Sequence, residues 1–210
     1  PDIAGMRRLG LDPASPEGVL SRQCGFEPWE RDDGLHPDQS ADPNLAYNRY
    51  LREQGYDGDN PWHTAANAST GPDGEVLSGW YLRHAHLPAN VAAEHSETAY
   101  MTNRAIEKIT NLGDTPWCLH LSYIKPHWPY MAPTPYHNMY SDSDILPANR
   151  SDNEKQTPNP VIEAFMQHEE SRNFSREEVR RRVIPAYMGL ITEIDDNIGR
   201  LMASLKASGR

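Results

Sequence analysis

The chain contains 210 residues, enough for one large domain or for part of a bigger one. Hydrophobic residues make up 37% of it, the mean hydropathy is -0.77 and 18 residues are proline, so much of the chain is expected to form surface loops. The formal net charge is -10, because 30 acidic residues outnumber 20 basic ones. This charge would repel a nucleic-acid backbone or an anionic membrane, so neither is expected as a partner.

Targeting signals and cysteines set further bounds. No apolar run approaches the length of a membrane span, and the N-terminal residues lack the charged and apolar regions of a signal peptide. The chain starts at Pro1 without an initiator methionine, which suggests an excised piece. Cys24 and Cys118 have neither a metal-binding spacing nor a disulfide framework. We therefore expect two free thiols in a reducing, cytoplasmic compartment.

The first ninety residues carry one helix signal. Asp42 is a candidate N-cap, Pro43 fits the first turn, and Gly55 marks the end of the helix. The apolar positions of this helix are Tyr47, Tyr50 and Leu51. The surrounding sequence is punctuated by Pro, Gly, Asp and Asn, so it is expected to be excursion loop instead of core.

A clearer helix is predicted from Ser96 to the residue before Gly113, and a strand follows it at residues 117–123. The apolar face of the helix consists of Ala99, Thr102, Ala105, Ile106 and Ile109. The strand alternates with a period of two, the pattern of a buried strand. One face carries Trp117, Leu119, Leu121 and Tyr123, and the other carries Cys118, His120 and Ser122.

A proline-rich loop directly follows this strand. Pro126 and Pro129 end the strand, because neither can donate to a ladder and each disfavours helical geometry in the residue before it. The loop therefore holds the ammonium of Lys125 and the imidazole of His127 at the end of a strand, where open α/β sheets place their ligand sites. This position is a candidate anion site.

The last third of the chain ends in its strongest helix signal. Residues 141–173 are polar and hold a possible short helix at 161–168. Ser175 and Glu178 then have capping-box spacing, and Pro185 is expected to kink or divide the long helix near its second turn. The apolar positions of the long helix are Val179, Val183, Tyr187, Leu190, Ile191, Ile194, Ile198, Leu201 and Leu205.

The order helix, strand, loop, long helix predicts an α/β fold, yet one strand does not make a sheet. Two explanations remain open. Either sequence outside this chain completes the sheet, or weak strands lie within the first ninety residues. We favour the first.

Two motifs carry a family resemblance. The stretch Lys125–Tyr140 (KPHWPYMAPTPYHNMY), preceded by PWCLHL at 116–121, resembles the middle of sulfatases, especially phosphonate monoester hydrolases of the alkaline phosphatase superfamily. The segment Tyr187–Leu201 is similar to the helix before the later metal-ligand strand of that family. Residues 33–37 (DGLHP) and 54–57 (QGYD) resemble its variable substrate-side region.

The resemblance implies both a fold and a division of the chain. The fold would be a fragment of an alkaline phosphatase-like α/β/α sandwich with a loop-rich first half and a long C-terminal helix. Residues 1–95 would form a substrate-side region, and residues 96–210 a helix-strand-loop-helix part of the catalytic domain.

The resemblance also implies a hydrolase that cleaves sulfate esters, phosphodiesters or phosphonate monoesters. Such enzymes use a formylglycine nucleophile, made from Cys-x-Pro-x-Arg, beside a divalent metal (Ca, Mn or Mg). Neither Cys24 nor Cys118 stands in that motif, and the later Asp-His metal pair is expected beyond Arg210. The nucleophile and metal are therefore expected from sequence outside this chain, which alone should be inactive.

Two acidic pairs do not replace the metal ligands of the family. Asp195 and Asp196 are adjacent on a helix and point about 100° apart, so they are expected to cap or salt-bridge neighbouring elements. The pair at 32–33 lacks an apolar strand before it and is typical of a turn. No metal ligand is assigned within this chain.

The resemblance assigns one catalytic residue and two substrate-binding residues. His127 matches a histidine that contacts the ester oxygens near the leaving group, where an imidazole stabilises developing charge. The alternative is a structural histidine tied to a loop carbonyl. Lys125 matches a position with Lys or Arg in relatives, and it is expected either to bind substrate or to be a solvated lysine. Tyr136 and His137 match a Pro-Tyr-His pattern for which packing is the better interpretation.

Other residues favour different interpretations. Four aromatic residues of the first half could line a pocket, although such residues more often form the core: Tyr47, Tyr50, Trp62 and Trp80. His84 and His86 would share one side of a strand and could chelate a transition metal with His95 or His120. The alternative function is therefore a non-catalytic metal-binding or interaction module. For the hydrolase, the expected partners are a small anionic ester and, in the complete protein, further copies of itself.

Overall fold

The structure is a computed structural model that describes the chain except for residues 1–2, 23, 31, 33–44 and 157–158. Its α-helices are α1 (Ile3–Arg8), α2 (Pro16–Arg22), α3 (Ala46–Glu53), α4 (Glu97–Asn111), α5 (Pro160–Gln167), α6 (Glu169–Phe174) and α7 (Glu177–Ala207). Strands β1 (Ala68–Thr70) and β2 (Val76–Ser78) form an antiparallel hairpin in which Ala68 pairs with Ser78. Short π- or 3₁₀-helical turns occupy Trp62–Ala66, Leu82–His84, Ala93–His95, Tyr136–Asn138, Asp142–Asp144 and Asp152–Lys155.

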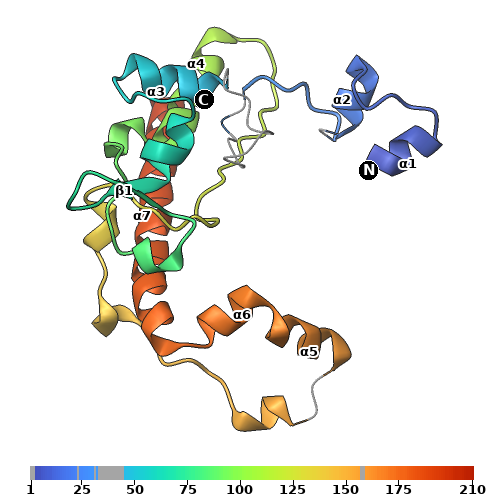
Figure 1. Ribbon diagram of the computed structural model, residues 1–210. Coiled ribbons are helices and arrows are strands. Elements are labelled where there is room, and N and C mark those ends of the chain that lie inside the picture. The colour runs from blue at the N-terminus through green and yellow to red at the C-terminus, as the bar shows by residue number, and fades with distance from the viewer. Residues whose placement is uncertain (1–2, 23, 31, 33–44, 157–158) are drawn as a thin grey trace.

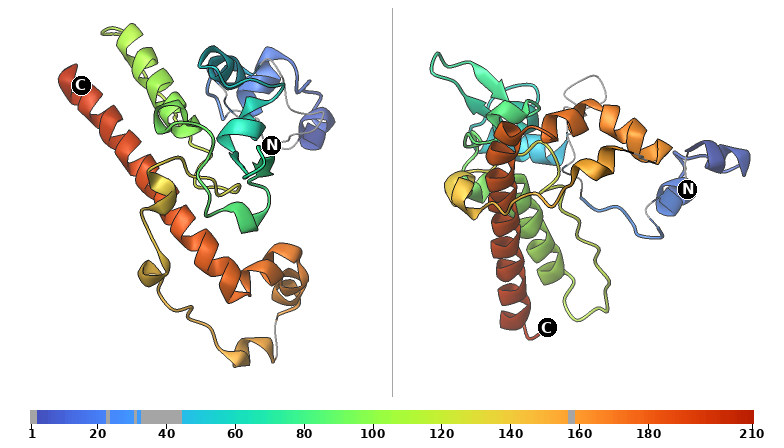
Figure 2. Two further views of the ribbon diagram at one scale, coloured as in Figure 1. Left: turned by 60° about the vertical axis from the view of Figure 1, so that its left-hand side comes forward. Right: turned by 90° about the horizontal axis from the view of Figure 1, so that it is seen from below.

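Helix α7 is the longest element, and the other parts are arranged along it (Figure 1). Helix α4 runs beside the C-terminal half of α7 (Figure 2). Helix α3 contacts α4 through the rings of Tyr47 and Tyr100. Helices α5 and α6 form an arm at the N-terminal end of α7, whereas α1 and α2 lie at the edge of the molecule (Figure 1). Among the described residues, no helix is both long and apolar enough to cross a membrane.

The largest hydrophobic cluster lies mainly in the first half of the chain, so the expectation that this region is excursion loop is wrong. Its buried members are Leu45, Tyr47, Leu51, Trp62, Ala65, Ala66, Ala89, Val91, Tyr100, Met101 and Met131. Tyr50 and Trp80 pack against the cluster, which confirms that the aromatic residues form core. Aromatic rings and alanines supply the apolar area that the scarce aliphatic residues do not. The cluster also joins residues from both sides of position 95. The predicted division of the chain into residues 1–95 and 96–210 stays a prediction.

Helix α3 agrees with the predicted pattern where the structure describes it. Tyr47 and Leu51 are buried, and Gly55 has a φ of +89° just beyond the helix end, a conformation that glycine adopts without strain. The proposed cap Asp42 and its neighbour Pro43 lie outside the described residues.

Helix α4 confirms its predicted start. The Ser96 hydroxyl oxygen accepts a hydrogen bond from the Ala99 amide at 3.1 Å, as an N-cap does. The buried side chains Ala99, Thr102, Ala105 and Ile109 form the predicted face. The helix therefore presents an apolar stripe to α7 and to the main cluster.

The strand predicted at residues 117–123 is wrong as a secondary-structure assignment. The segment is extended, but its backbone forms no hydrogen bond to any other described residue. Leu119, Leu121 and Tyr123 are half-buried and alternate with exposed side chains, while Trp117 is exposed. A strand requires a neighbouring strand for its ladder, and the β1–β2 hairpin, which pairs only within itself, does not supply one.

Helices α5 and α7 test three predictions made from the sequence. Helix α5 confirms the short helix, but Ser175 is not a capping residue, because its hydroxyl donates to the Arg172 carbonyl at 2.7 Å. Arg176 precedes α7 instead, without a side-chain cap. Pro185 lies inside α7 and does not divide it. Its side chain is buried in the packed turn around Val183, which offsets one missing backbone hydrogen bond.

The buried face of α7 differs from the predicted apolar face. The helix contacts α4, the loop at 136–138 and the turn at Leu82–His84. Its buried residues are Val183, Pro185, Ala186, Gly189, Leu190, Glu193 and Asn197. Tyr187, Ile191 and Ile198, which were expected to be buried, are each at least 40% exposed. The predicted periodicity is present. The buried face is rotated about the helix axis relative to the predicted one, and it includes the polar side chains of Glu193 and Asn197.

A pocket beside the proline-rich loop

The loop at 125–132 is anchored to the hairpin region at three points. The Lys125 ammonium donates to the Asn67 side-chain oxygen at 2.5 Å. The Ala132 carbonyl accepts from the Ala89 amide at 2.9 Å, and the Met131 side chain fills the space above Gly79. The loop that carries both predicted site residues is therefore held by the first half of the chain, 40 or more residues away in sequence.

Lys125 is buried, with 6% of its surface exposed, and its ammonium points into the protein. Besides Asn67, it donates to the Pro129 carbonyl at 2.8 Å. Burial lowers the pKa of Lys125, and the nearby carboxylates of Glu97 and Glu193 oppose that shift. The solvated-lysine alternative is therefore wrong for this residue, while its binding of an ester stays a prediction.

The His127 side chain is exposed and has one fixed hydrogen bond. Its Nδ1 lies 2.6 Å from the Trp128 carbonyl oxygen. A carbonyl can only accept, so Nδ1 must carry a proton. The neutral imidazole then has its lone pair on Nε2, and only the imidazolium can donate a hydrogen bond from Nε2. The loop-carbonyl contact expected of a structural histidine is present, and it leaves Nε2 available for a ligand.

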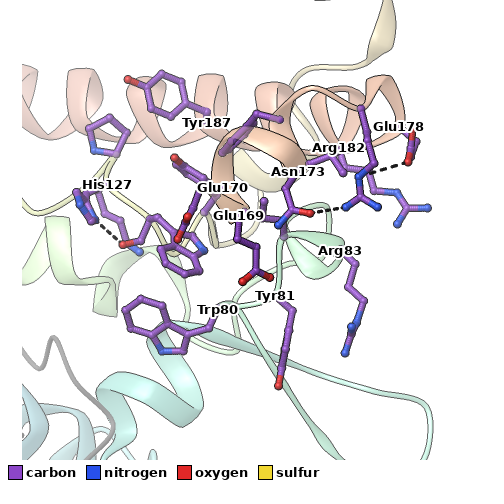
Figure 3. A pocket seen from close by; sticks show the side chains of 18 of the residues that line it. Trp80, Tyr81, Arg83, His127, Glu169, Glu170, Asn173, Glu178, Arg182 and Tyr187 are labelled. Atoms are coloured by element: carbon purple, nitrogen blue, oxygen red, sulfur yellow. Dashed lines mark hydrogen bonds and ion pairs between the residues drawn. The ribbon is translucent and has the colours of Figure 1, made fainter. Parts of the chain in front are cut away.

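His127 lines a cavity of about 1130 Å³ between the loop, the segment after β2 and the arm formed by α6 and the start of α7. The aromatic residues of its walls are Trp80, Tyr81, Tyr123, Trp128, Tyr130, Phe174 and Tyr187. Its charged or titratable residues are Arg83, Lys125, His127, Glu169, Glu170, Arg176, Glu178 and Arg182. Figure 3 shows His127 at one end, Glu178 and Arg182 at the other, and Glu169 and Glu170 between them.

The aromatic walls are packed against one another. The rings of Trp80 and Trp128 meet edge to face, with centroids 4.8 Å apart, and the Tyr130 ring contacts those of Phe174 and Tyr187 at 6.3 and 6.0 Å. The indole nitrogens of Trp80 and Trp128 are buried without a hydrogen-bond partner among the described residues. The cavity therefore combines rigid apolar surface with few fixed polar contacts, an arrangement typical of small-molecule sites.

A buried polar cluster lies beneath the loop, where α4 begins and α7 passes. Glu193 is 1% exposed and accepts a hydrogen bond from Ser96. Burial raises the pKa of Glu193 to about 7, although that hydrogen bond and the charge of Lys125 act in the opposite direction. Glu97 accepts from the Trp62 indole at 2.7 Å. Two acidic side chains thus surround one buried ammonium.

The sequence did not lead us to Asn67 or Glu193 as parts of this cluster. A signal for Glu193 exists, because it stands three residues after Leu190 and four before Asn197, on one helical face. Asn67 carries no comparable signal, since its position opposite Lys125 depends on a contact across 58 residues.

The alternative metal site is not assembled. Among the described residues, no three or more His, Cys, Asp or Glu side chains come together as metal ligands. His84 Nδ1 contacts the Ser78 carbonyl at 2.8 Å, and His95 contacts the Tyr56 hydroxyl at 3.0 Å. Asp196 instead accepts a hydrogen bond from Tyr136 at 2.8 Å, as expected of a residue that ties elements together.

The described residues therefore offer no cluster that fits a resident divalent metal. Cys24 and Cys118 are free thiols, as predicted, and both are exposed and lie outside the cavity. The turn at Tyr136–Asn138 packs against α7, which agrees with the packing interpretation for the Tyr136–His137 pair.

Comparison with known proteins identifies the family. The sulfatase family profile matches residues 16–210. The chain therefore belongs to the sulfatase family, as the two motifs predicted.

Curated relatives agree with this assignment. The multifunctional alkaline phosphatase superfamily protein PehA of Trinickia caryophylli is 31% identical over 135 residues, which are 59% of this chain and 26% of that protein. Choline-sulfatase of Rhizobium meliloti (strain 1021) is 26% identical over 144 residues, 63% of this chain and 28% of that enzyme. The chain thus spans about a quarter of the length of these relatives.

Solved structures establish the fold. A phosphonate monoester hydrolase from Silicibacter pomeroyi superposes with a TM-score of 0.66 at 23% identity, covering 96% of this chain and 39% of that chain. The enzyme of the same description from Agrobacterium radiobacter gives a TM-score of 0.62 at 19% identity, covering 91% and 44%. The predicted fold class is confirmed: the chain is part of an alkaline phosphatase-like fold, rich in helix, with a small sheet and a long C-terminal helix.

Proposed function

We propose that this chain forms the leaving-group side of the active site in an enzyme that hydrolyses sulfate esters, phosphodiesters or phosphonate monoesters. The observation that carries the proposal is the placement of His127. Its Nδ1 is fixed on the Trp128 carbonyl at 2.6 Å, while its ring lines a cavity of about 1130 Å³. Membership of the sulfatase family supplies the reaction class, ester hydrolysis.

His127 acts in this proposal as an imidazolium. Cleavage of the ester bond leaves negative charge on the leaving-group oxygen, and the Nε2–H of His127 donates to that oxygen as the charge develops. The proton is transferred to a poor leaving group and is only shared with a good one. Because Nδ1 already carries a proton, the neutral imidazole has no hydrogen to donate from Nε2.

The nucleophile and the metal come, in this proposal, from sequence outside the 210 residues. Two observations support this division. The chain spans about a quarter of the length of its curated relatives, and neither cysteine stands in the nucleophile motif of the family. A formylglycine in that outside sequence would supply the nucleophile, and a divalent metal would supply Lewis-acid stabilisation of the ester oxygens. This chain would bind and orient the leaving group and exclude water from it.

The setting of the protein is also part of the proposal. The ligand is a small anionic ester, and the complete protein is a homo-oligomer in a cytoplasmic compartment. The two exposed free thiols support a reducing compartment. The negative charge of the chain argues against nucleic acid as a partner.

The test is a leaving-group series measured on the complete enzyme and its His127→Ala variant at equal metal loading. We expect kcat/KM to fall roughly a hundredfold for alkyl esters, and less for aryl esters with acidic leaving groups. His86→Ala is the matched control, because His86 is an exposed histidine outside the cavity. Equal losses across the whole series, or no loss, would remove His127 from the catalytic assignment.

A further inference from the structure

The Lys125 side chain closes the loop around His127 by a hydrogen bond to the loop's own backbone. Its ammonium reaches the carbonyl of Pro129, four residues later, and so brackets the residues on either side of His127. The His127 amide donates to the Ile124 carbonyl at 3.0 Å, which closes the same turn from the other side. The backbone around His127 is thus held by one side-chain and one main-chain hydrogen bond.

The other partner of Lys125 is itself immobilised. Asn67 is fully buried, and its amide nitrogen donates to the Trp62 carbonyl at 3.0 Å. The Asn67 carbonyl accepts from the Gly79 amide at 2.9 Å, so the residue also joins the π-helical turn to the end of the hairpin. Through Asn67, Lys125 connects the loop to the main hydrophobic cluster.

The charges beneath the loop explain why an ammonium is tolerated there. Glu97 and Glu193 face Lys125 from the start of α4 and from the inner face of α7. A buried ammonium without such partners would be strongly unfavourable. Asn67 and Pro129 occupy two of its three donor positions, and the carboxylates supply the compensating charge.

The hydrogen bonds of Lys125 also constrain the His127 imidazole, through the backbone of the loop. The acceptor of the His127 Nδ1 proton is the carbonyl of Trp128, which lies between His127 and the clamped Pro129. The Trp128 ring is also fixed, edge-on to Trp80. The position of that carbonyl selects the tautomer of His127 and leaves Nε2 without a hydrogen-bond partner among the described residues.

We propose that Lys125 and Asn67 form a positioning clamp that acts on the ester through the backbone of the loop and the tautomer of His127, without contacting the ester. This assignment replaces the substrate-binding role predicted for Lys125. Its catalytic consequence rests on the function proposed above, whereas its effect on the tautomer does not. A displaced imidazole would no longer align with the leaving-group oxygen.

The tautomer is measured by nitrogen NMR of histidine-labelled complete protein, with the His127 signals identified from their loss in His127→Gln. We expect wild-type His127, when neutral, to carry its proton on Nδ1. In Lys125→Met the signals should shift toward an exchanging mixture of both tautomers. Lys206→Met is the control, because Lys206 is exposed and distant from the loop. If Lys125→Met does not fold, the double variant Lys125→Met with Glu193→Gln takes its place in the measurement, because the double variant removes one charge of each sign.

Kinetics separate the clamp from a ligand role. The clamp predicts that Lys125→Met lowers kcat about 10- to 100-fold and changes KM by less than about twofold. An ester ligand predicts the reverse, a raised KM with kcat retained and an unchanged tautomer, and that result overturns the inference. So does an unchanged Nδ1 tautomer in a folded variant. If the wild-type enzyme turns over no ester, the proposed function fails, while a tautomer shift in Lys125→Met still supports the clamp.

Discussion

Helix α7 has two faces that differ in how far the rest of the described chain covers them. The face against α4 and the loop at 136–138 holds the buried Leu190, but also Gly189 and the polar side chains Glu193 and Asn197. The outer face holds larger apolar side chains: Tyr187, Ile191, Ile198 and Met202, each at least 40% exposed. Large apolar side chains are therefore present on the face that the described residues cover less.

This difference shows what apolar periodicity measures. Apolar periodicity indicates that a helix face packs against a neighbour. It does not tell whether that neighbour belongs to the same stretch of chain. The inner face meets α4, a neighbour within the chain. In the proposed complete enzyme, the outer face would meet sequence outside these 210 residues. The following predictions test the two faces against each other.

The largest expected effect is that of a charge on the inner face. Leu190 is fully buried, so Leu190→Asp should lower the free energy of unfolding by about 4 kcal/mol or more, since it buries an unpaired carboxylate. Ile191→Asp is the matched control on the outer face, with 46% exposure, and should cost under about 1 kcal/mol in this chain. Urea melts of both variants measure the difference. Equal costs would show that the two faces are covered alike.

The second effect is a pH dependence that originates from Glu193. Its pKa rises from 4.5 to about 7 on folding, so the folded state binds a proton that the unfolded state has lost. The stabilisation is complete below about pH 4.5 and is lost as the pH rises through about 7, a change of roughly 3 kcal/mol. Glu193→Gln should lack this slope, so the difference between the wild-type and variant pH–stability profiles should contain it. Parallel profiles would show that Glu193 titrates normally.

The third effect concerns Gly189, where α7 touches the loop at 136–138. A Cβ atom at this position would collide with the Tyr136 carbonyl oxygen. Gly189→Ala should therefore cost about 1–3 kcal/mol, despite the better helix propensity of alanine. Gly199→Ala in the same helix has open space and should stabilise by about 0.5–1 kcal/mol. Thermal melts that shift in the same direction for both variants would contradict the close contact.

The smallest effect is expected for the contact between Tyr136 and Asp196 of α7. Burial and the hydrogen bond to Asp196 raise the pKa of Tyr136 to about 12. Asp196→Asn keeps an acceptor for the tyrosine hydroxyl, so it should cost less than about 1 kcal/mol. Removing the negative charge should nevertheless lower the pKa of Tyr136, which an absorbance titration of tyrosinate measures. No change in that pKa would show that the hydrogen bond does not form in solution.

The sequence predicted elements better than it predicted their surroundings. The cap of α4 at Ser96 was readable because capping depends on neighbours three residues away. The extended segment at 117–123 was recognised by its alternation, but a ladder also needs a partner strand, which local sequence cannot report. The fold class followed from the family motifs instead of from the elements.

The candidate site was predicted in part for the same reason. His127 stood out because prolines surround it within a family motif. The burial of Lys125 did not, because it depends on Asn67 and on carboxylates that are distant in sequence. Glu97 and Glu193 lie on two helices whose periodic patterns gave no reason to pair them. Contacts across long sequence separations are the information that a single sequence does not carry.

The extended segment at 117–123 also determines how the isolated chain should behave in a test tube. Its backbone donors and acceptors have no partners in the described chain, and half-buried apolar side chains alternate along it. Such an edge is a template for pairing with the same segment of another molecule. The net charge of -10 opposes that association through mutual repulsion. Salt screens the repulsion, so concentrated preparations should precipitate as ionic strength rises instead of dissolving more readily.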